Sequence, residues 1–413
     1  MNPYPNQHHK HNISDMFWGT LWIVFMVSSA FYVFRSGLPQ PSDWVMATIG
    51  VLLFLGGNLA MPKTYPAVLK AMIWFVGYVC LVNLMWFLIT QKTEFLIFSV
   101  FYVFNLGASI VFWSLYRKMG DRILSYTAFA ILVSVFVQSV IILLDFSMTG
   151  ANTRFVGTFN NPNQLAHFGI LMASICTILS RANRIPKALS RFFMPICYLG
   201  NIHAVNASLS RGGLMAMALA IVLGLMRNVK MAILFCLLGI VVIASGTFSQ
   251  KIDSTFDRIR ARFQIGNFGM QNDVEFWARN GIQRMWANPQ YLLLGAGEGY
   301  IQRFESTHGI YYEIHSSIGT VIFSYGAIGF LLVLRIFWPI FKKRKSAMLF
   351  IVPVIAFGTT HNGLRQTEVW LIPLLVWLTI DSIQWKSVRA IQKRSNQLPV
   401  ERHDQEFSPS GQF

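Results

Sequence analysis

Long apolar runs alternate with short polar connections along most of the chain. A helix that crosses a lipid bilayer needs roughly 20 mostly apolar residues, and about twelve runs of this kind can be placed in the 413 residues. They lie near residues 16–34, 43–60, 67–89, 95–116, 123–145, 164–180, 190–207, 212–227, 230–247, 317–339, 346–361 and 367–384. The pattern predicts an all-α polytopic membrane protein in which residues 1–413 form a single transmembrane domain.

The lysine and arginine residues gather in every second connection. Counted from a cytoplasmic N-terminus, the inner connections hold basic clusters at 117–122, 181–191, 342–345 and 386–394, whereas the short outer connections hold few basic residues. Because positively charged loops remain in the cytoplasm, this asymmetry predicts that both termini are cytoplasmic.

The composition agrees with a membrane protein and argues against a nucleic-acid-binding protein. Hydrophobic residues make up 54% of the chain and charged residues only 12%, against about 25% charged residues in soluble domains. A formal net charge of +17 would point to nucleic acid in a soluble protein, but here the inner loops explain it. Membrane lipids are therefore expected partners, and nucleic acid is not.

One outer connection, residues 248–316 between the ninth and tenth runs, is long enough to form a subdomain. "KIDSTFDRIRARF" has apolar residues at helical spacing, and "NDVEFWARNGIQRMWANP" begins with an Asn/Asp cap and stops at proline. "GAGEGY" at 295–300 is a glycine-rich turn, without the strand–helix context of a dinucleotide site. Residues 395–413 are polar and predicted to be a disordered cytoplasmic tail.

Among the arginines in short outer connections, where the positive-inside rule disfavours them, Arg154, Arg211 and Arg365 need an explanation. Arg211 precedes two glycines where a helix begins. Free backbone N–H groups, the positive end of the helix dipole and a guanidinium group together form an anion site that suits a pyrophosphate. The competing interpretation is that an interfacial arginine contacts lipid headgroups.

The outer side offers further polar residues for such a site. Asn163 follows Arg154 in "TRFVGTFNNPNQLA", and the long connection adds Arg279 and Arg284. Arg279 could instead pair with Glu275 one helical turn earlier, a contact worth only about 0.3–0.5 kcal/mol.

His315 stands at the mouth of the tenth run, in "YYEIHSSIGTVIFSYGAIG", with Glu313 two residues before it. On a helix, Gly326 and Gly329 would lie close to the same face as His315, and small residues there would let another helix approach closely. An unperturbed histidine pKa of about 6.5 suits a general base. The alternative is a hydrogen-bonded structural histidine.

The sequence gives little reason to expect a metal or a cofactor. The four cysteines lie in apolar runs, so neither a disulfide framework nor a zinc site is indicated. Asp273 and Glu275 form an acid-x-acid pair of the kind that holds a metal in some glycosyltransferases, but two acids at the start of a helix are explained more simply by the helix dipole.

These motifs, taken in order, resemble the superfamily of O-antigen ligases and O-antigen polymerases. Members share a pattern like "RFVGTFNNPNQLA", then "SLSRGG", then a long periplasmic loop that ends in a histidine motif. In the ligases the motif is His, then Asn, Ser or Gln, nine residues, Gly, two residues, then Gly, Thr or Tyr. His315, Ser316, Gly326 and Gly329 match it. The ligases often also have Arg-x-x-x-Leu, whereas Arg211 is followed at that spacing by Met215.

The resemblance implies a GT-C-like, metal-independent glycosyltransferase of the bacterial inner membrane with a periplasmic active site and no cofactor. Its donor would be a glycan on undecaprenyl pyrophosphate, and its acceptor a sugar hydroxyl of lipid A–core. Carried onto this chain, Arg211 and Arg279 would bind the pyrophosphate, with Arg154 a third cation. His315 would act on the acceptor hydroxyl or assist the leaving group. Asn163, Glu313, Arg284 and Arg365 are secondary candidates.

Three other functions stay open at this point. An O-antigen polymerase would run the same chemistry with a growing glycan as acceptor. A protein O-oligosaccharyltransferase is a second enzyme of the superfamily, although this chain lacks the larger periplasmic C-terminal part of that group. A transporter of lipid-linked glycans is the non-enzymatic alternative, and it predicts ionisable residues near the bilayer midplane.

Overall fold

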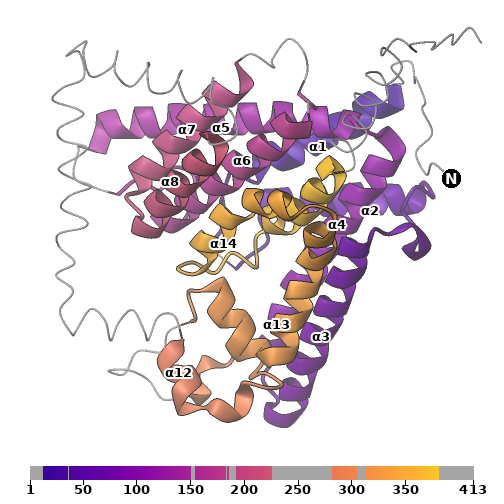
Figure 1. Ribbon diagram of the computed structural model, residues 1–413, viewed down its shortest axis with the longest axis vertical. Helices are drawn as coiled ribbons and strands as arrows, with labels where there is room; N and C mark the ends of the chain where they lie inside the picture. Colours follow the sequence, from indigo (N-terminus) through magenta and orange to yellow (C-terminus); the bar gives the residue numbers. More distant parts are fainter. Residues whose placement is uncertain are drawn as a thin grey trace, which may run out of the picture.

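The computed structural model describes residues 13–35, 37–149, 154–182, 184–185, 192–225, 281–304 and 313–380. Within these ranges every regular element is a helix. The α-helices are α1 (Ile13–Ser28), α2 (Pro41–Leu55), α3 (Ala67–Thr90), α4 (Glu94–Met119), α5 (Arg122–Thr149), α6 (Pro162–Ala182), α7 (Phe193–Ser208), α8 (Arg211–Leu225), α12 (Ile282–Ala287), α13 (Ser317–Lys343), α14 (Val352–Gly358) and a last helix over Thr367–Ile380 (Figure 1).

Five of these helices are long and apolar enough to cross a membrane: Ala67–Thr90, Glu94–Met119, Arg122–Leu144, Pro162–Ala182 and Ser317–Lys343. Four further apolar helices are shorter: Ile13–Ser28, Pro41–Leu55, Arg211–Leu223 and Thr367–Ile380. The prediction of a helical membrane protein is confirmed.

The count of twelve spans is not confirmed: one predicted run lies outside the described residues, and another differs from its prediction. The ninth predicted run, 230–247, lies outside them, as do most of the long connection and the C-terminal tail. Where a helix was expected over 346–361, the chain forms a 3₁₀ helix, Lys345–Phe350, followed by the short α14. Pro353 lies in the first turn of α14, where its missing N–H costs no intrahelical hydrogen bond.

Local signals in the sequence set several helix ends. Pro41 opens α2 after Gln40, which forms a capping box with Asp43. At the start of α13 the side chain of Ser316 accepts a hydrogen bond from the N–H of Gly319 at 3.0 Å. Gly120, at φ +60°, ends α4 in the left-handed region that glycine adopts readily.

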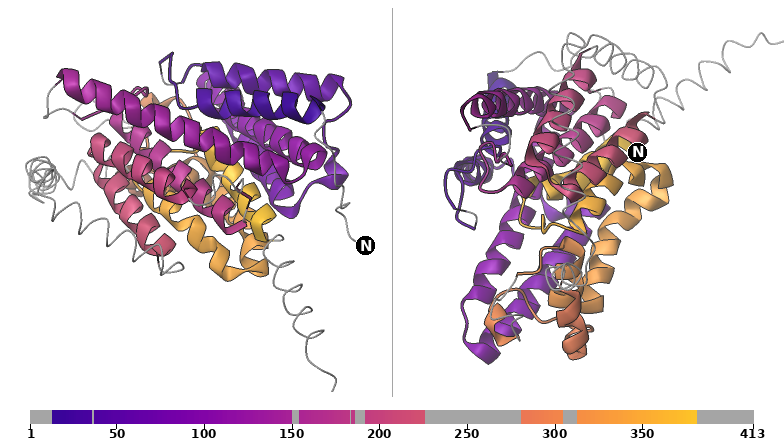
Figure 2. Two further views of the ribbon diagram at one scale, coloured as in Figure 1. Left: turned by 90° about the horizontal axis from the view of Figure 1, so that it is seen from above. Right: turned by 90° about the vertical axis from the view of Figure 1, so that its left-hand side faces the viewer.

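The helices form two groups. One gathers α5, α7 and α8 around α6, with α1 packed against α5, and the α6 span is 83% buried inside the protein. The other pairs α3 with α4 and α13. Figure 1 shows α14 between the two groups, and Figure 2 shows α1 and α2 side by side at the edge of the first. An apolar helix with so much of its surface covered by protein is a core element rather than a lipid-facing one.

Helix α13 is interrupted at Gly326, whose φ of 65° and ψ of −169° are not helical. Gly326 was predicted to admit a neighbouring helix. The neighbour is instead the segment 292–297: a Cβ at Gly326 would lie 2.3 Å from the carbonyl oxygen of Leu293. At the facing Gly295 a Cβ would lie 2.4 Å from the carbonyl oxygen of Ser324. Two backbones meet here with no room for side chains.

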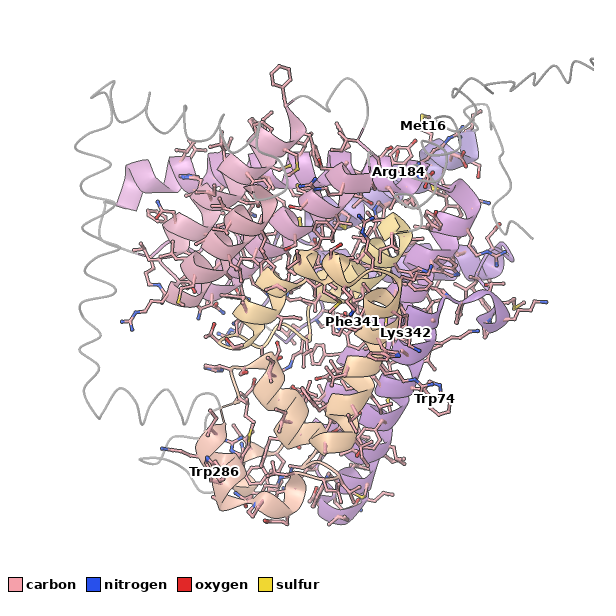
Figure 3. The ribbon with its side chains drawn as sticks, viewed as in Figure 1. Met16, Trp74, Arg184, Trp286, Phe341 and Lys342 are labelled. Carbon is pink, nitrogen blue, oxygen red and sulfur yellow. The ribbon has the colours of Figure 1, made fainter. Side chains whose placement is uncertain are left out.

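Polar contacts join the predicted connections in two separate sets. Contacts among the predicted inner connections are the Arg122–Asp15 ion pair, Lys118 Nζ to Asn58 Oδ1 at 3.0 Å, and Ser125 Oγ to the carbonyl of Arg184 at 3.0 Å. Contacts among the predicted outer connections are Tyr32 N to Thr158 O at 3.0 Å, Phe155 N to Ala207 O at 3.1 Å, and Ser317 N to His361 O at 3.3 Å. Figure 3 places Arg184 and Trp286, one from each set of connections, far apart.

This separation predicts opposite labelling of the two ends. In a chain whose native cysteines are replaced by alanine, Thr93→Cys and Lys63→Cys put one thiol at each exposed end. In right-side-out membrane vesicles, a membrane-impermeant maleimide is expected to label Thr93→Cys and to reach Lys63→Cys only after permeabilisation. Both should react in detergent, and labelling of both from one side would contradict the separation.

Candidate functional site

A buried carboxylate, Glu298, lies at the centre of the polar network between α3, α4 and α13. Its Oε2 accepts hydrogen bonds from the hydroxyl groups of Tyr102 at 2.7 Å and Tyr325 at 3.0 Å. Its Oε1 accepts from Nη2 of Arg365 at 2.8 Å and from Nε at 3.2 Å. Only 7% of the Glu298 side chain is exposed. A charge so deeply buried is tolerated because its acceptor sites are filled.

The interruption of α13 holds this carboxylate in place. A continuous helix would pair the carbonyls of Phe323 and Ser324 with the N–H groups of residues 327 and 328. Instead Ala296 N and Gly297 N donate to those carbonyls at 2.9 and 2.8 Å, while Ala327 N and Ile328 N donate to the carbonyls of residues 292 and 293 at 2.8 and 3.5 Å. The loop therefore satisfies all four backbone groups that the break releases, and Glu298 follows directly.

Arg303 braces the same loop from the other side. Its Nη2 donates to the carbonyl of Ala296, and its guanidinium lies 4.7 Å from the ring of Trp86, 4.9 Å from Phe95 and 4.6 Å from Phe304. Burial lowers the pKa of Arg303 to about 10. An arginine packed among three aromatic rings stabilises its surroundings by cation–π contact, so its role here is to hold the loop.

Arg365 links Glu298 to the segment that precedes α13. Besides its two hydrogen bonds to Glu298, its Nη2 donates to Oε2 of Glu313 at 3.2 Å, and its guanidinium lies 4.3 Å from the ring of Phe98. Burial acts to lower the pKa of Arg365, but the two carboxylates, Glu298 first, raise it overall. Arg365 is thus a cation already neutralised by the protein.

A cleft of about 180 Å³ opens over this network. Its carboxylates are Glu94, Glu298 and Glu313, and its guanidinium groups are Arg284 and Arg365. Arg284 lies 5.2 Å from the ring of Phe304, and burial lowers its pKa. The cleft is consequently polar and has more acidic than basic side chains.

His315 is exposed beside this cleft, and its neighbours in the chain, Glu313 and Ile314, line it. Its position depends on the loop after α14, because the carbonyl of His361 accepts hydrogen bonds from Ser317 N at 3.3 Å and Ser317 Oγ at 3.0 Å. Burial, and to a smaller extent the nearby His315, lower the pKa of His361 to about 4.

Arg211 lies on the other side of the same loop. Gly212 packs so closely that a Cβ there would lie 2.3 Å from Oγ1 of Thr360, the residue before His361. Among the residues that the structure describes, the buried Nε of Arg211 has no hydrogen-bond partner. A buried guanidinium nitrogen left unsatisfied is costly, so a bound anion would offset that cost.

Arg154 and Asn163 are brought to Arg211 by the turn between α7 and α8. Nε of Arg154 donates to the carbonyl of Ser208 at 3.0 Å, and its Nη2 donates to Oδ1 of Asn163 at 3.1 Å. Ser208 precedes Arg211 by three residues. The expected proximity of these motifs is therefore observed, although Arg154 already serves protein acceptors.

The described structure thus places most of the predicted site residues around the loop 359–366. Arg211, with Arg154 and Asn163 near it, lies beside Thr360 at the start of the loop. Arg365 belongs to the loop, and Glu313 and Arg284 line the cleft with it, close to His315. Arg279, and the Asp273/Glu275 pair, lie outside the described residues. Arg365 was expected near an anion and is instead paired with two glutamates.

Glu298 was not among the predicted site residues. The sequence did offer a signal, since a single acidic residue stands between glycines in "GAGEG". Its partner Tyr102 is 196 residues away, and no local pattern announces that pairing.

Within the described ranges, no group of three or more histidine, cysteine, aspartate or glutamate side chains is arranged to hold a metal ion. Comparison with known proteins adds no assignment, because no protein-family model matches this chain and no curated protein is significantly similar to it.

We predict that Glu298 and Arg365 are coupled in their contributions to the free energy of unfolding. Glu298→Gln is expected to lower the free energy of unfolding by at least about 2 kcal/mol, because it leaves a partly buried guanidinium without its main partner. In the double variant with Glu298→Gln and Arg365→Gln, the loss of unfolding free energy should be smaller than the sum of the losses in the two single variants by about 1 kcal/mol or more. Denaturant unfolding in mixed micelles measures this.

Glu313→Gln is the matched control, since Glu313 pairs with the same arginine from a side chain that is 49% exposed. Its effect should be about 0–1 kcal/mol. Equal effects of the two glutamate variants, or strict additivity in the double variant, would contradict a central role for Glu298.

His361 predicts a pH dependence of stability. Because its folded pKa of about 4 lies below the ordinary value of about 6.5, the unfolded chain takes up a proton first as the pH falls. Stability should therefore decrease between about pH 6.5 and 4. His361→Gln should flatten the melting temperature over this window, and an unchanged profile in that variant would exclude His361 as the cause.

Proposed function

We propose that the protein is an O-antigen ligase of the bacterial inner membrane. In this proposal it transfers a glycan from undecaprenyl pyrophosphate to a sugar hydroxyl of lipid A–core on the periplasmic face, with both termini in the cytoplasm. The supporting observation is that three sequence motifs that resemble the ligases, those of Arg154, Arg211 and His315, supply residues near one loop, 359–366. The buried Nε of Arg211 lacks a hydrogen-bond partner among the described residues.

The chemistry divides between the two sides of the loop. His315 would accept the proton of the acceptor hydroxyl as its oxygen bonds to the anomeric carbon of the donor. The bond from that carbon to the pyrophosphate oxygen breaks, and the leaving group departs with the electron pair. Arg211, with Arg154 near it, would stabilise the negative charge that develops on the pyrophosphate. The resemblance assigns the same role to Arg279, which lies outside the described residues. Cations fixed in advance where charge develops lower a barrier of this kind.

The two-sided arrangement of polar contacts supports the proposed sidedness. The site residues belong to connections predicted to be outer. At the opposite end, the basic residues Lys118, Arg122 and Arg184 form polar contacts with residues in or next to other predicted inner connections. Basic residues mark the cytoplasmic side, and this supports the proposal of a periplasmic site.

An O-antigen polymerase remains the alternative that the same geometry favours, because both reactions need a diphosphate site and a base. The acceptor distinguishes them. A deletion strain whose lipid A–core bears no glycan, with long glycan retained on the carrier, indicates a ligase. Core that bears a single repeat unit indicates a polymerase.

His315→Ala and Arg211→Ala are predicted to abolish ligation while the protein stays folded. Loss of a general base typically costs a factor of about 10² to 10⁴, so complemented deletion strains should show uncapped lipid A–core on lipopolysaccharide gels and glycan accumulating on undecaprenyl pyrophosphate.

Arg35→Ala is the control for the arginine variant, because Arg35 is exposed and also lies in a predicted outer connection. It should ligate normally. Size-exclusion profiles in detergent check that all three variants are folded. Normal ligation by either site variant would remove the role assigned to that residue.

A further inference from the structure

We propose that the cleft over the Glu298–Arg365 network binds a sugar residue and, given the function proposed above, that this sugar belongs to the acceptor. The cleft is formed by the segment 297–304, the start of α4, the first half of α13 and Asn362. Its volume of about 180 Å³ leaves room for a small polar ligand such as one sugar ring.

The lining of the cleft has the chemistry that recognises a sugar. Exposed Glu94 and Gln302 and the more buried Thr320 and Asn362 offer carboxylate, amide and hydroxyl groups. A sugar hydroxyl both donates and accepts hydrogen bonds, so a wall that mixes acceptors and donors can satisfy several hydroxyls at once. Tyr300 adds an aromatic ring to the rim, suited to the apolar face of a pyranose.

Charge argues against a diphosphate in this cleft. Three carboxylates, Glu94, Glu298 and Glu313, face two guanidinium groups, and one of those, Arg365, is already bonded to both Glu298 and Glu313. An anion placed there would meet more acidic than basic side chains, and like charges in a confined space repel strongly. The diphosphate is thus directed to the Arg211 side of the loop, and the neutral sugar to this side.

The position of the cleft, beside the segment that carries His315, indicates that this sugar belongs to the acceptor. Glu313 and Ile314 line the cleft, and His315 follows them directly in the chain. The side chain of Asn362 donates a hydrogen bond to Oγ1 of Thr320 at 3.1 Å. Asn362 directly follows His361, whose carbonyl accepts a hydrogen bond from Ser317. A sugar in the cleft therefore lies close to the chain segment that carries His315, whose imidazole the proposed function assigns to the acceptor hydroxyl.

The first test measures binding without any reaction. Full-length protein in nanodiscs is mixed with the methyl glycosides of glucose, galactose, N-acetylglucosamine and heptose at millimolar concentration, and saturation-transfer NMR reports contact. At least one glycoside should bind the parent protein. Gln302→Ala and Glu94→Ala should lose most of that signal, because each removes an exposed polar group from the cleft. Arg211→Ala should keep it.

Gln290→Ala is the matched control, since Gln290 is also exposed, lies in the described segment 281–304 with Gln302, and does not line the cleft. Absence of binding by every glycoside, or equal signals from Gln290→Ala and both cleft variants, would overturn the sugar site.

The second test separates the sugar site from the proposed reaction. With purified lipid A–core and donor, Gln302→Ala should raise the acceptor KM about two- to tenfold, as expected for one lost hydrogen bond, and leave the donor KM unchanged. A raised donor KM instead would overturn the acceptor assignment. If the parent protein binds glycosides through the cleft but transfers no glycan, the sugar site stands and the proposed function fails.

Discussion

The exchange of backbone hydrogen bonds at the break in α13 is the interaction on which the candidate site depends. A helix interrupted in an apolar protein interior exposes N–H and C=O groups that are costly to leave unpaired. Here the loop 292–297 supplies a partner for each, and two glycines, Gly295 and Gly326, allow the backbones to meet. This fixed contact ties a distant part of the chain to the middle of a membrane helix.

The position and the contacts of Glu298 depend on this backbone contact. The carboxylate enters between α4 and α13, where Tyr102, Tyr325 and Arg365 satisfy it. Arg365 in turn reaches Glu313, and so connects the loop after α14 to the residues just before His315. The packing of the helices and the position of the exposed imidazole are therefore coupled through one buried ion pair.

The loop 359–366 divides the candidate site by charge. On one side Arg154 and Arg211 stand at the start of α8, with a buried guanidinium nitrogen that lacks a protein partner. On the other side an acidic, polar cleft adjoins His315. A transfer from a diphosphate to a neutral hydroxyl needs this division, because the leaving group and the nucleophile have opposite electrostatic requirements.

The sequence by itself determined the features that depend on local composition. Apolar runs predicted the five long helices found among the described residues, and Ser316 marked the start of α13. The arginines disfavoured by the positive-inside rule, together with His315, marked the end of the molecule where the candidate site residues lie. Only the tertiary structure decided that Gly326 breaks its helix, that Arg365 is neutralised by protein carboxylates, and that Glu298 is the buried partner. These features arise from contacts between residues up to 196 positions apart, and their free energy depends on burial and geometry that no local pattern encodes.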